Sequence, residues 1–383
     1  MKNKQLVMIP GPTPTIGPLQ LQMARETVSF KDPGFVNDFK ELVIDLKEML
    51  LTDGECVVIA GTGTLAMETA IANTTKPGDN ILIVSHGFFG DRFIEMCERR
   101  GLTVDVLSSE WGQAVSVADI EQKLAEKKYA ALTVTHVDTS TGTCAPVAEI
   151  GAVAKKFDDT IFIVDGVCAT AAEPEYVDDM GIDVLLTGSQ KAFGVTPGLA
   201  ILWAGPRALE RRKSLGTIPD AYMDFEKWIP IMQDPMKYWG TPPVNLIWAL
   251  KEAVNLIKEE GLEERYVRHR RDAKGIQAGL EALGFKILAA PDCRAATLSV
   301  AIYPDGIDDA AFRNILTEEG VVTAASLGAY AGKSFRLGHM GNIDKHTVVS
   351  VLAAIERTLH RVGQPVEFGR SIRVYMESYL SSD

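Results

Sequence analysis

Short apolar runs alternate with amphipathic segments over the first half of the chain. Each run is four to six residues long, as in a buried strand, and the intervening segments repeat apolar positions with helical spacing. The runs that predict strands are residues 56–59, 80–84, 103–107, 130–135, 161–164, 184–187 and 199–203. Seven strands alternating with helices predict an α/β fold with a large, mostly parallel, seven-stranded, doubly wound sheet.

Helical periodicity flanks this region on both sides. Residues 16–28 and 35–51 have helical patterns before the strands. Residues 243–260 and 262–283 predict two long helices that break at Gly261, where we expect a hinge.

Beyond the hinge the pattern predicts a smaller α+β domain. Its predicted strands are residues 286–289, 296–302 and 334–337, and its predicted helices are residues 308–319 and 345–359. The segment after Gly363 has no clear partner in the pattern. We therefore expect an N-terminal arm over residues 1–15 that packs near the functional site, a large domain over 16–260 and a small C-terminal domain over 261–383.

Composition narrows the class of protein. The chain has 383 residues, 46% of them hydrophobic, which is enough for the cores of about two or three domains. A net charge of −12 without a long basic run argues against nucleic-acid binding. The five cysteines form no CxxC pair, the histidines have no metal-ligand spacing, and no apolar run approaches the length of a membrane span. We expect a cytoplasmic protein with no metal site, disulfide framework or membrane anchor.

A lysine and an aspartate are candidate residues of a reactive site. Lys191 follows the predicted strand 184–187 and a Gly-Ser-Gln turn, and Asp165 directly follows the apolar run 161–164. The interval between them fits one strand, a crossover helix and the next strand, which brings both side chains to one sheet edge. Such a pair suits pyridoxal phosphate, because the amine condenses with its aldehyde and the carboxylate keeps its ring nitrogen protonated. A solvated surface lysine is the alternative.

A glycine- and threonine-rich turn supplies a candidate anion site. The sequence AGTGTLAME places Gly61, Thr62, Gly63 and Thr64 between a strand and a helix. Backbone N–H groups at a helix N-terminus, with threonine hydroxyls beside them, bind phosphate. An ordinary strand-to-helix turn without a ligand is also compatible with this sequence. A dinucleotide site is less favoured, because the glycines do not have the GxGxxG spacing.

Eight segments in a fixed order resemble one enzyme family. They are IPGPTPT, AGTGTLAME, HGFFGDR, HVDTSTG, IFIVDGV, TGSQKAFGVTPG, YWGTPPVN and SFRLGHMGN. Together they are similar to the class V aminotransferases of the fold type I pyridoxal-phosphate enzymes, and particularly to the alanine–glyoxylate and serine–pyruvate group. The resemblance covers nearly the whole chain. It implies a fold type I aminotransferase, pyridoxal 5'-phosphate as cofactor, and a homodimer with shared active sites.

The resemblance also implies roles for particular residues. Lys191 would carry the cofactor and act as the catalytic base, and the α-carboxylate of the substrate would be bound by Arg336 and by the arm at Gly11. The remaining cofactor contacts would be Thr62, Gly63, Thr64 and Gln190 at the phosphate, Phe89 against the ring face, Thr139 at the ring oxygen, Asp165 at the ring nitrogen, Val167 beneath the ring, and Tyr238 and Thr241 from the neighbouring subunit.

Some of these assignments have competitors. Phe88 competes with Phe89, and Ser140 offers a hydroxyl beside Thr139. His136 is either an orienting group or an ordinary histidine at a strand end. Thr64 departs from the histidine or alanine that is often seen there in the family, which would alter the rim of the pocket.

The implied reaction moves an amino group from a small amino acid, alanine or serine, to a small 2-oxo acid, glyoxylate or pyruvate. No second arginine is clearly assigned to a distal carboxylate, which favours small substrates over aspartate. A cysteine desulfurase or lyase would need a cysteine within residues 321–334, which contain none. The sequence is also compatible with pyridoxamine–pyruvate transamination and with an inactive cofactor-binding protein, although the intact Asp165, Lys191 and Arg336 argue against the inactive protein.

Overall fold

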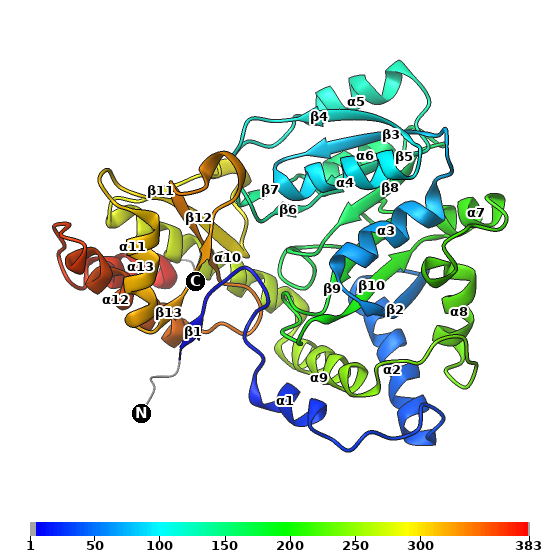
Figure 1. Cartoon of the computed structure of the whole chain (residues 1–383), viewed down its shortest axis with the longest axis horizontal. Helices are drawn as coiled ribbons and strands as arrows, with labels where there is room; N and C mark the ends of the chain where they lie inside the picture. The colour runs from blue at the N-terminus through cyan, green and yellow to red at the C-terminus, as the bar shows by residue number, and fades with distance from the viewer. Residues whose placement is uncertain (1–4, 382–383) are drawn as a thin grey trace.

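The computed structural model describes residues 5–381, which form a larger and a smaller lobe (Figure 1). The larger lobe contains a seven-stranded sheet in the order β2-β10-β9-β8-β5-β3-β4. Its strands are β2 (Glu55–Gly61), β3 (Asn80–Ser85), β4 (Thr103–Ser108), β5 (Ala131–Thr135), β8 (Ile161–Asp165), β9 (Val184–Gly188) and β10 (Gly198–Ala204).

The strand directions confirm the predicted sheet, but the crossover helix expected between Asp165 and Lys191 is absent, because the segment from β8 to β9 consists of turns. β3 is parallel to β4 and β5, β5 is parallel to β8, and β8 is parallel to β9, whereas β10 is antiparallel to both β9 and β2. Every residue of β5, β8 and β9 is buried, which explains why these strands read as continuous apolar runs.

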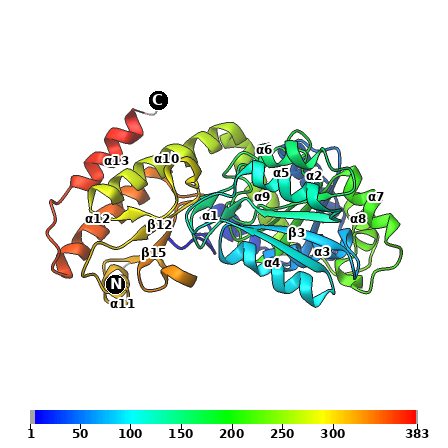
Figure 2. The same ribbon diagram turned by 90° about the horizontal axis from the view of Figure 1, so that it is seen from above.

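Helices cover both faces of the sheet. Figure 2 shows α3 (Gly63–Thr74) and α4 (Phe88–Arg99) on one side of it, and α5 (Val117–Glu126) and α6 (Val147–Ala154) on the other. The other elements of this lobe are α1 (Gly17–Met23), α2 (Pro33–Met49), α7 (Pro206–Ser214), α8 (Phe225–Gln233), the 3-10 helix η1 (Ala221–Met223) and a small hairpin of β6 (Val137–Asp138) and β7 (Thr143–Cys144).

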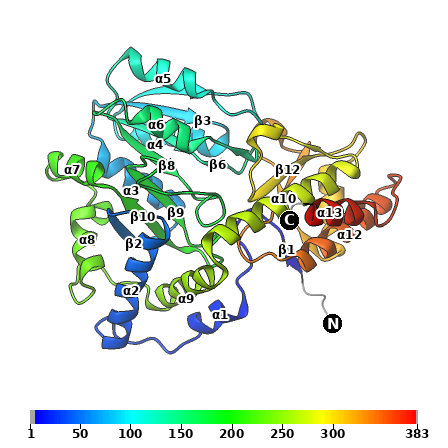
Figure 3. The same ribbon diagram turned by 180° about the vertical axis from the view of Figure 1, so that it is seen from behind.

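The predicted break at Gly261 is present. α9 (Val244–Glu260) ends and α10 (Leu262–Ala282) begins at this glycine, whose φ of 85° is readily adopted only by glycine. α10 then crosses into the smaller lobe, as Figure 3 shows from behind.

The smaller lobe has a sheet and an apolar core of its own. Its antiparallel sheet has the order β11 (Lys286–Ile287), β12 (Leu298–Ile302), β15 (Ser334–Gly338), β14 (Ala324–Ala325). Phe285, Phe312 and Phe335 lie in a core that is distinct from the core of the larger lobe. The other elements are α11 (Asp309–Glu318), α12 (Lys345–Arg361) and the 3-10 helices η2 (Pro291–Cys293) and η3 (Gly328–Tyr330).

The helix predicted over residues 16–28 and the segment after Gly363 differ from the expectation. The arm joins the smaller lobe, where β1 (Leu6–Val7) pairs in parallel with β13 (Val321–Val322), and the helix predicted over residues 16–28 ends at Met23. The segment after Gly363 has a partner after all, because α13 (Arg370–Leu380) packs along α10 and α12 (Figure 3).

Burial of one tyrosine and capping by one glutamate explain how α13 docks. Tyr375 is fully buried, lies against Gly275 of α10 and donates to Asp272 at 3.1 Å. The buried carboxylate of Glu356 on α12 accepts from the backbone of Gly369 and Ser371 at the start of α13. These contacts lie on other elements, so the local pattern of the tail did not reveal them.

No helix within residues 5–381 is long and apolar enough to cross a bilayer.

Candidate active site

Lys191 and Asp165 line one cavity at the carboxyl ends of β8 and β9. The cavity has a volume of about 110 Å³. Its wall includes eight of the residues that the sequence predicts for the site: Thr62, Gly63, Thr64, Phe89, Asp165, Val167, Gln190 and Lys191. Residues more than 120 positions apart thus meet in one cavity, as expected for the carboxyl edge of a doubly wound sheet.

Asp165 is the last residue of β8 and is 3% exposed. One carboxylate oxygen accepts from the backbone N–H of Val167 at 2.9 Å, and the other is 3.5 Å from the hydroxyl of Thr135. Burial raises the pKa of the Asp165 carboxyl to about 7, and neither the hydrogen bond from Val167 nor the charge of Lys191 offsets that. A cationic ligand group in the cavity would therefore stabilise the ionised form.

The arm packs directly against Lys191. The ammonium of Lys191 donates to the carbonyl of Pro10 at 2.5 Å, and the hydroxyl of Thr13 donates to the carbonyl of Lys191 at 2.7 Å. A Cβ atom at Gly11 would lie 2.5 Å from the Lys191 Nζ atom, and Gly11 has a φ of 115°. Only glycine fits this close approach. The structure therefore places Gly11 beside Lys191, the candidate catalytic residue.

The turn before α3 forms the other end of the cavity. Thr62 precedes the first turn of this helix, whose N-terminal N–H groups have no partner within the helix. A Cβ atom at Gly63 would lie 2.7 Å from Val167, so glycine is required for the helix to come this close. The side-chain oxygen of Gln190 is buried and has no hydrogen-bond partner among the described residues. Rotating this amide by half a turn would direct its NH2 group to a ligand.

Phe89, and not Phe88, lines the cavity, whereas Phe88 is 41% exposed. Asp138 fixes the start of α4, because its carboxylate accepts from the backbone of Phe89 at 2.9 Å and of Gly90 at 3.1 Å. Ser140 is occupied in the same contact, since its hydroxyl donates to Asp138 at 2.6 Å and accepts from the Phe88 N–H at 3.0 Å. The sequence interpretation missed Asp138, which lies three positions after the predicted strand 130–135.

Arg336 and Thr139 meet across the two lobes. The Nη1 atom of Arg336, on β15, donates to the Thr139 hydroxyl at 3.3 Å, and its Nε atom donates to the carbonyl of Ala325 at 2.9 Å. Burial lowers the pKa of the Arg336 guanidinium, so an anionic partner would be favourable there. Neither residue is in the wall of the cavity around Lys191.

Tyr238 and Thr241 lie at the surface and outside this cavity. Tyr238 is 58% exposed, its hydroxyl is 3.3 Å from that of Thr241, and its ring packs on Phe30 with the centroids 5.0 Å apart. Within one chain these two residues do not reach the site.

His136 is held by a carboxylate. Its Nδ1 atom is 2.7 Å from Glu175, and its backbone N–H donates to the Asp165 carbonyl at 2.9 Å. It is not in the cavity wall, and its ring is satisfied by Glu175. Four other wall residues were missed by the sequence interpretation: Met67, Arg92, Val137 and Cys168. The sequence did contain an indication for Arg92. It lies three positions after Phe89 on a helix, so both residues share one face of that helix.

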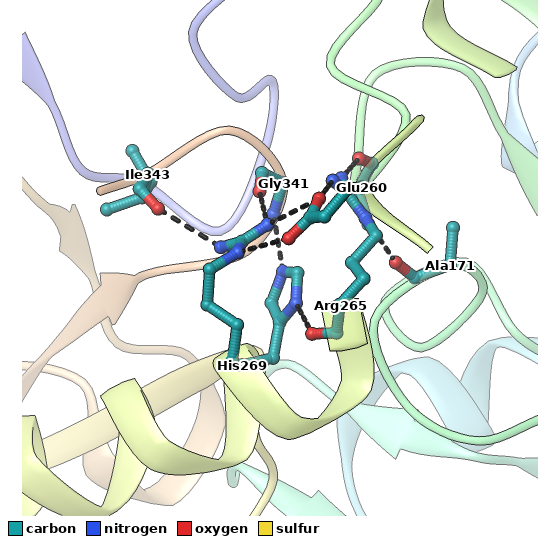
Figure 4. Close-up of polar contacts among 8 residues, drawn as sticks. Ala171, Glu260, Arg265, His269, Gly341 and Ile343 are labelled. Atoms are coloured by element: carbon teal, nitrogen blue, oxygen red, sulfur yellow. Dashed lines mark hydrogen bonds and ion pairs between the residues drawn. The ribbon is translucent and has the colours of Figure 1, made fainter. Parts of the chain in front are cut away.

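A network at the hinge connects the loops that carry the site (Figure 4). Arg265, which is 2% exposed, donates to the carbonyls of Ala171 at 2.9 Å and of Ala192 at 2.7 Å. It also forms an ion pair with Glu260 at 2.6 Å, and this glutamate pairs with Arg268 as well. Ala192 adjoins Lys191, so the hinge is tied to the loop of the candidate lysine.

The same network continues into the smaller lobe. Arg268 donates to the carbonyls of Gly341 at 3.0 Å and Ile343 at 3.1 Å, a few residues after Arg336 (Figure 4). His269 accepts from the Gly341 N–H at Nε2, so its other ring nitrogen, 2.7 Å from the Arg265 carbonyl, carries the proton. Burial lowers the pKa of His269, in agreement with this neutral form. The network thus connects the two lobes beside the site.

These features define an α/β protein with a buried acid–lysine site at the carboxyl edge of its sheet, and comparison with known proteins identifies the family. The family model Aminotransferase class-V matches residues 38–337. The chain therefore belongs to the class V aminotransferases, and it is an enzyme of the transaminase class.

Within residues 5–381 no group of three or more histidine, cysteine or acidic side chains is arranged to hold a metal ion.

Individual relatives cover almost the whole chain. The L-aspartate–glyoxylate aminotransferase of Paracoccus denitrificans is 31% identical over 99% of this chain and 97% of that protein. A serine–glyoxylate aminotransferase of Arabidopsis thaliana is 30% identical over 96% and 93%. The crystal structure of an alanine–glyoxylate aminotransferase from Nostoc has a TM-score of 0.89 at 31% identity, and covers 94% of this chain and 96% of that one.

The raised pKa of Asp165 predicts a pH-dependent stability of the protein without cofactor. The ordinary carboxyl pKa is 3.8 and the folded value is about 7, so the native state binds more protons between these values and loses stability as the pH rises through them. Asp165→Asn should therefore stabilise the cofactor-free protein at about pH 8 by up to roughly 4 kcal/mol, with the gain disappearing near pH 4.

Urea unfolding of the cofactor-free proteins at several pH values would measure this difference. Asp158→Asn, at an exposed aspartate, is the matched control and should change stability little at any pH. A stability gain for Asp165→Asn that is the same at every pH would contradict the titration of this carboxyl.

Proposed function

We propose that this enzyme transfers the amino group of alanine or serine to glyoxylate or pyruvate, with pyridoxal 5'-phosphate bound at Lys191. The observation that carries the proposal is the shared cavity of Lys191, Asp165 and the N-terminal turn of α3. An amine, a buried acid and an anion site are the three groups that this cofactor requires.

The cavity fits the cofactor on its own evidence. The buried Asp165 gains from a protonated ring nitrogen, and the free side chain of Gln190 and the α3 turn offer donors to a phosphate. Phe89 supplies an aromatic surface and Val167 an apolar one. When bound, pyridoxal phosphate supplies the aldehyde that takes up the amino group and a ring that accepts electrons from Cα.

Lys191 would move the proton of the reaction. Its amine lies in the cavity beside Asp165 and the carbonyl of Pro10. The neutral amine can remove the proton from Cα of the amino acid and return a proton at the end of the transfer. The Pro10 carbonyl holds the amine when it is not engaged, and the absence of a side chain at Gly11 leaves room for it.

Arg336 would bind the α-carboxylate of the substrate. Its guanidinium presents a planar fork suited to two parallel hydrogen bonds, and Ala325 and Thr139 fix its orientation. Because Thr139 comes from the larger lobe and Arg336 from the smaller one, carboxylate binding would also set the positions of the lobes relative to each other.

Two observations support transamination over sulfur release. Residues 321–334 contain no cysteine, and the cysteine nearest the site, Cys168, is 5% exposed in the cavity wall. Burial raises the pKa of the Cys168 thiol to about 11, so this thiol stays protonated and is a poor nucleophile.

The five cysteines are unpaired, which suits the reducing cytoplasm that we propose as the location.

A matrix of amino donors against 2-oxo acceptors tests the reaction. Alanine, serine and aspartate would be combined with glyoxylate, pyruvate and oxaloacetate, and the products identified by mass spectrometry. We expect alanine or serine with glyoxylate or pyruvate to give kcat/KM values at least about tenfold above those of aspartate, because a second carboxylate would be buried without an assigned partner. Ammonia or sulfide release without amino transfer would contradict the proposal.

We further propose a homodimer in which Tyr238 and Thr241 reach the cofactor phosphate of the neighbouring subunit. Their position at the surface and outside their own cavity supports contact between subunits. Mixing a Lys191→Ala parent with a Tyr238→Phe/Thr241→Ala parent should restore activity. In each hybrid dimer one site carries both defects and the other carries neither, so activity should approach half that of wild type per dimer.

Differently tagged chains would verify that hybrids have formed. Hybrids of Lys191→Ala with the wild-type chain provide the reference for one intact site. Verified hybrids of the two mutant parents that stay inactive would show that Tyr238 and Thr241 act within their own subunit or have no role at the site.

A further inference from the structure

Arg92 projects into the cavity from the helix that also carries Phe89. The two residues are three positions apart on α4 and therefore share one face of the helix. The guanidinium carbon of Arg92 lies 4.8 Å from the centroid of the Phe89 ring, close enough for a cation–π interaction. This packing holds the cation at the cavity wall.

The charge of Arg92 is not balanced by a carboxylate. Within residues 5–381 it has no ion pair, and its hydrogen bond goes to the neutral hydroxyl of Thr64, at 3.3 Å from Nη1. The neighbouring acid, Asp91, accepts instead from the hydroxyl of Ser85 at 2.6 Å. A half-buried arginine without an acidic partner, facing a ligand cavity, is placed to bind an anion.

The contact with Thr64 shows which end of the cavity this anion would occupy. Thr64 lies in the first turn of α3, where free backbone N–H groups and the helix dipole also favour negative charge. The proposed carboxylate ligand, Arg336, is bonded to Thr139 and lies outside the cavity wall. The two arginines are therefore attached to different parts of the site.

We propose that Arg92 is a direct ligand of the cofactor phosphate and supplies one positive charge that offsets part of its negative charge. This inference rests on the proposed function. A helix N-terminus, hydroxyls and an amide bind a phosphate dianion without any formal positive charge, whereas the guanidinium fork adds one positive charge and two parallel donors. In this arrangement Thr64 orients Arg92, and the cation links the phosphate end of the site to the aromatic side chain over the ring.

The test compares two ligands that differ only in the phosphate. Equilibrium binding of pyridoxal 5'-phosphate and of pyridoxal would be measured by absorbance with cofactor-free wild type and with Arg92→Gln, Arg92→Lys and Arg99→Gln. Arg99 lies on the same helix, is 76% exposed and pairs with Glu95, so it is the matched control. Pyridoxal binding also reports whether each variant keeps a folded site.

We expect Arg92→Gln to weaken binding of the phosphorylated ligand about 10- to 100-fold and to leave pyridoxal binding within about twofold. Arg92→Lys, which keeps the charge but not the fork, should give a smaller loss, and Arg99→Gln none. Equal weakening of both ligands, or no weakening of either, would overturn the assignment. So would an effect confined to the KM of dicarboxylic substrates, because it would place a substrate carboxylate at Arg92.

The outcome is separable from the proposed function. If wild type binds pyridoxal 5'-phosphate and transfers amino groups while Arg92→Gln binds it normally, only the role of Arg92 is wrong. If wild type does not bind the cofactor, the proposed function fails together with this inference.

Discussion

The arrangement of the site depends on the cost of burying the Asp165 carboxylate. A charged carboxylate at the end of a buried strand is unfavourable unless a cation or several donors compensate for it. Here one backbone N–H contributes a hydrogen bond, and the pKa of the carboxyl still rises to about 7. The ionised form of Asp165 would therefore be stabilised by the cationic ring nitrogen of the proposed cofactor. This interaction would contribute to the free energy of binding of the proposed cofactor.

The hinge network connects the loops that carry the residues of the site. Arg265 contacts the loops that follow Asp165 and Lys191, and Arg268 contacts the loop that follows Arg336 (Figure 4). Both arginines pair with Glu260, so the cluster keeps one net positive charge, and both arginines donate to loop carbonyls. Arg265 is buried, whereas Glu260 and Arg268 are partly exposed, so the cluster extends from the interior to the surface of the hinge.

Much of the fold could be predicted because the signals were local. Apolar runs such as residues 161–164 marked the central strands, and Gly261 marked the break between the long helices. Asp165 and Lys191 could be paired because strand order in a parallel sheet brings carboxyl ends together. The resemblance of the motifs then supplied the identity of the family.

The features that were missed depend on contacts between distant segments. The docking of α13 requires Gly275 and Glu356, and the pairing of β1 requires β13, none of which is visible in the local pattern. Likewise, the meeting of Arg92 with Thr64 follows from the packing of α4 beside α3. Charged side chains on helices usually face solvent, so the spacing of Arg92 from Phe89 did not by itself place this arginine at the site.

The central claim is that Lys191 carries the cofactor, and covalent trapping tests it most directly. The purified enzyme with pyridoxal 5'-phosphate would be reduced with borohydride, digested and mapped by mass spectrometry. The account predicts one phosphopyridoxyl group per chain, located on Lys191 and absent from Lys191→Ala. A group located on another lysine, or retained in full by Lys191→Ala, would contradict it.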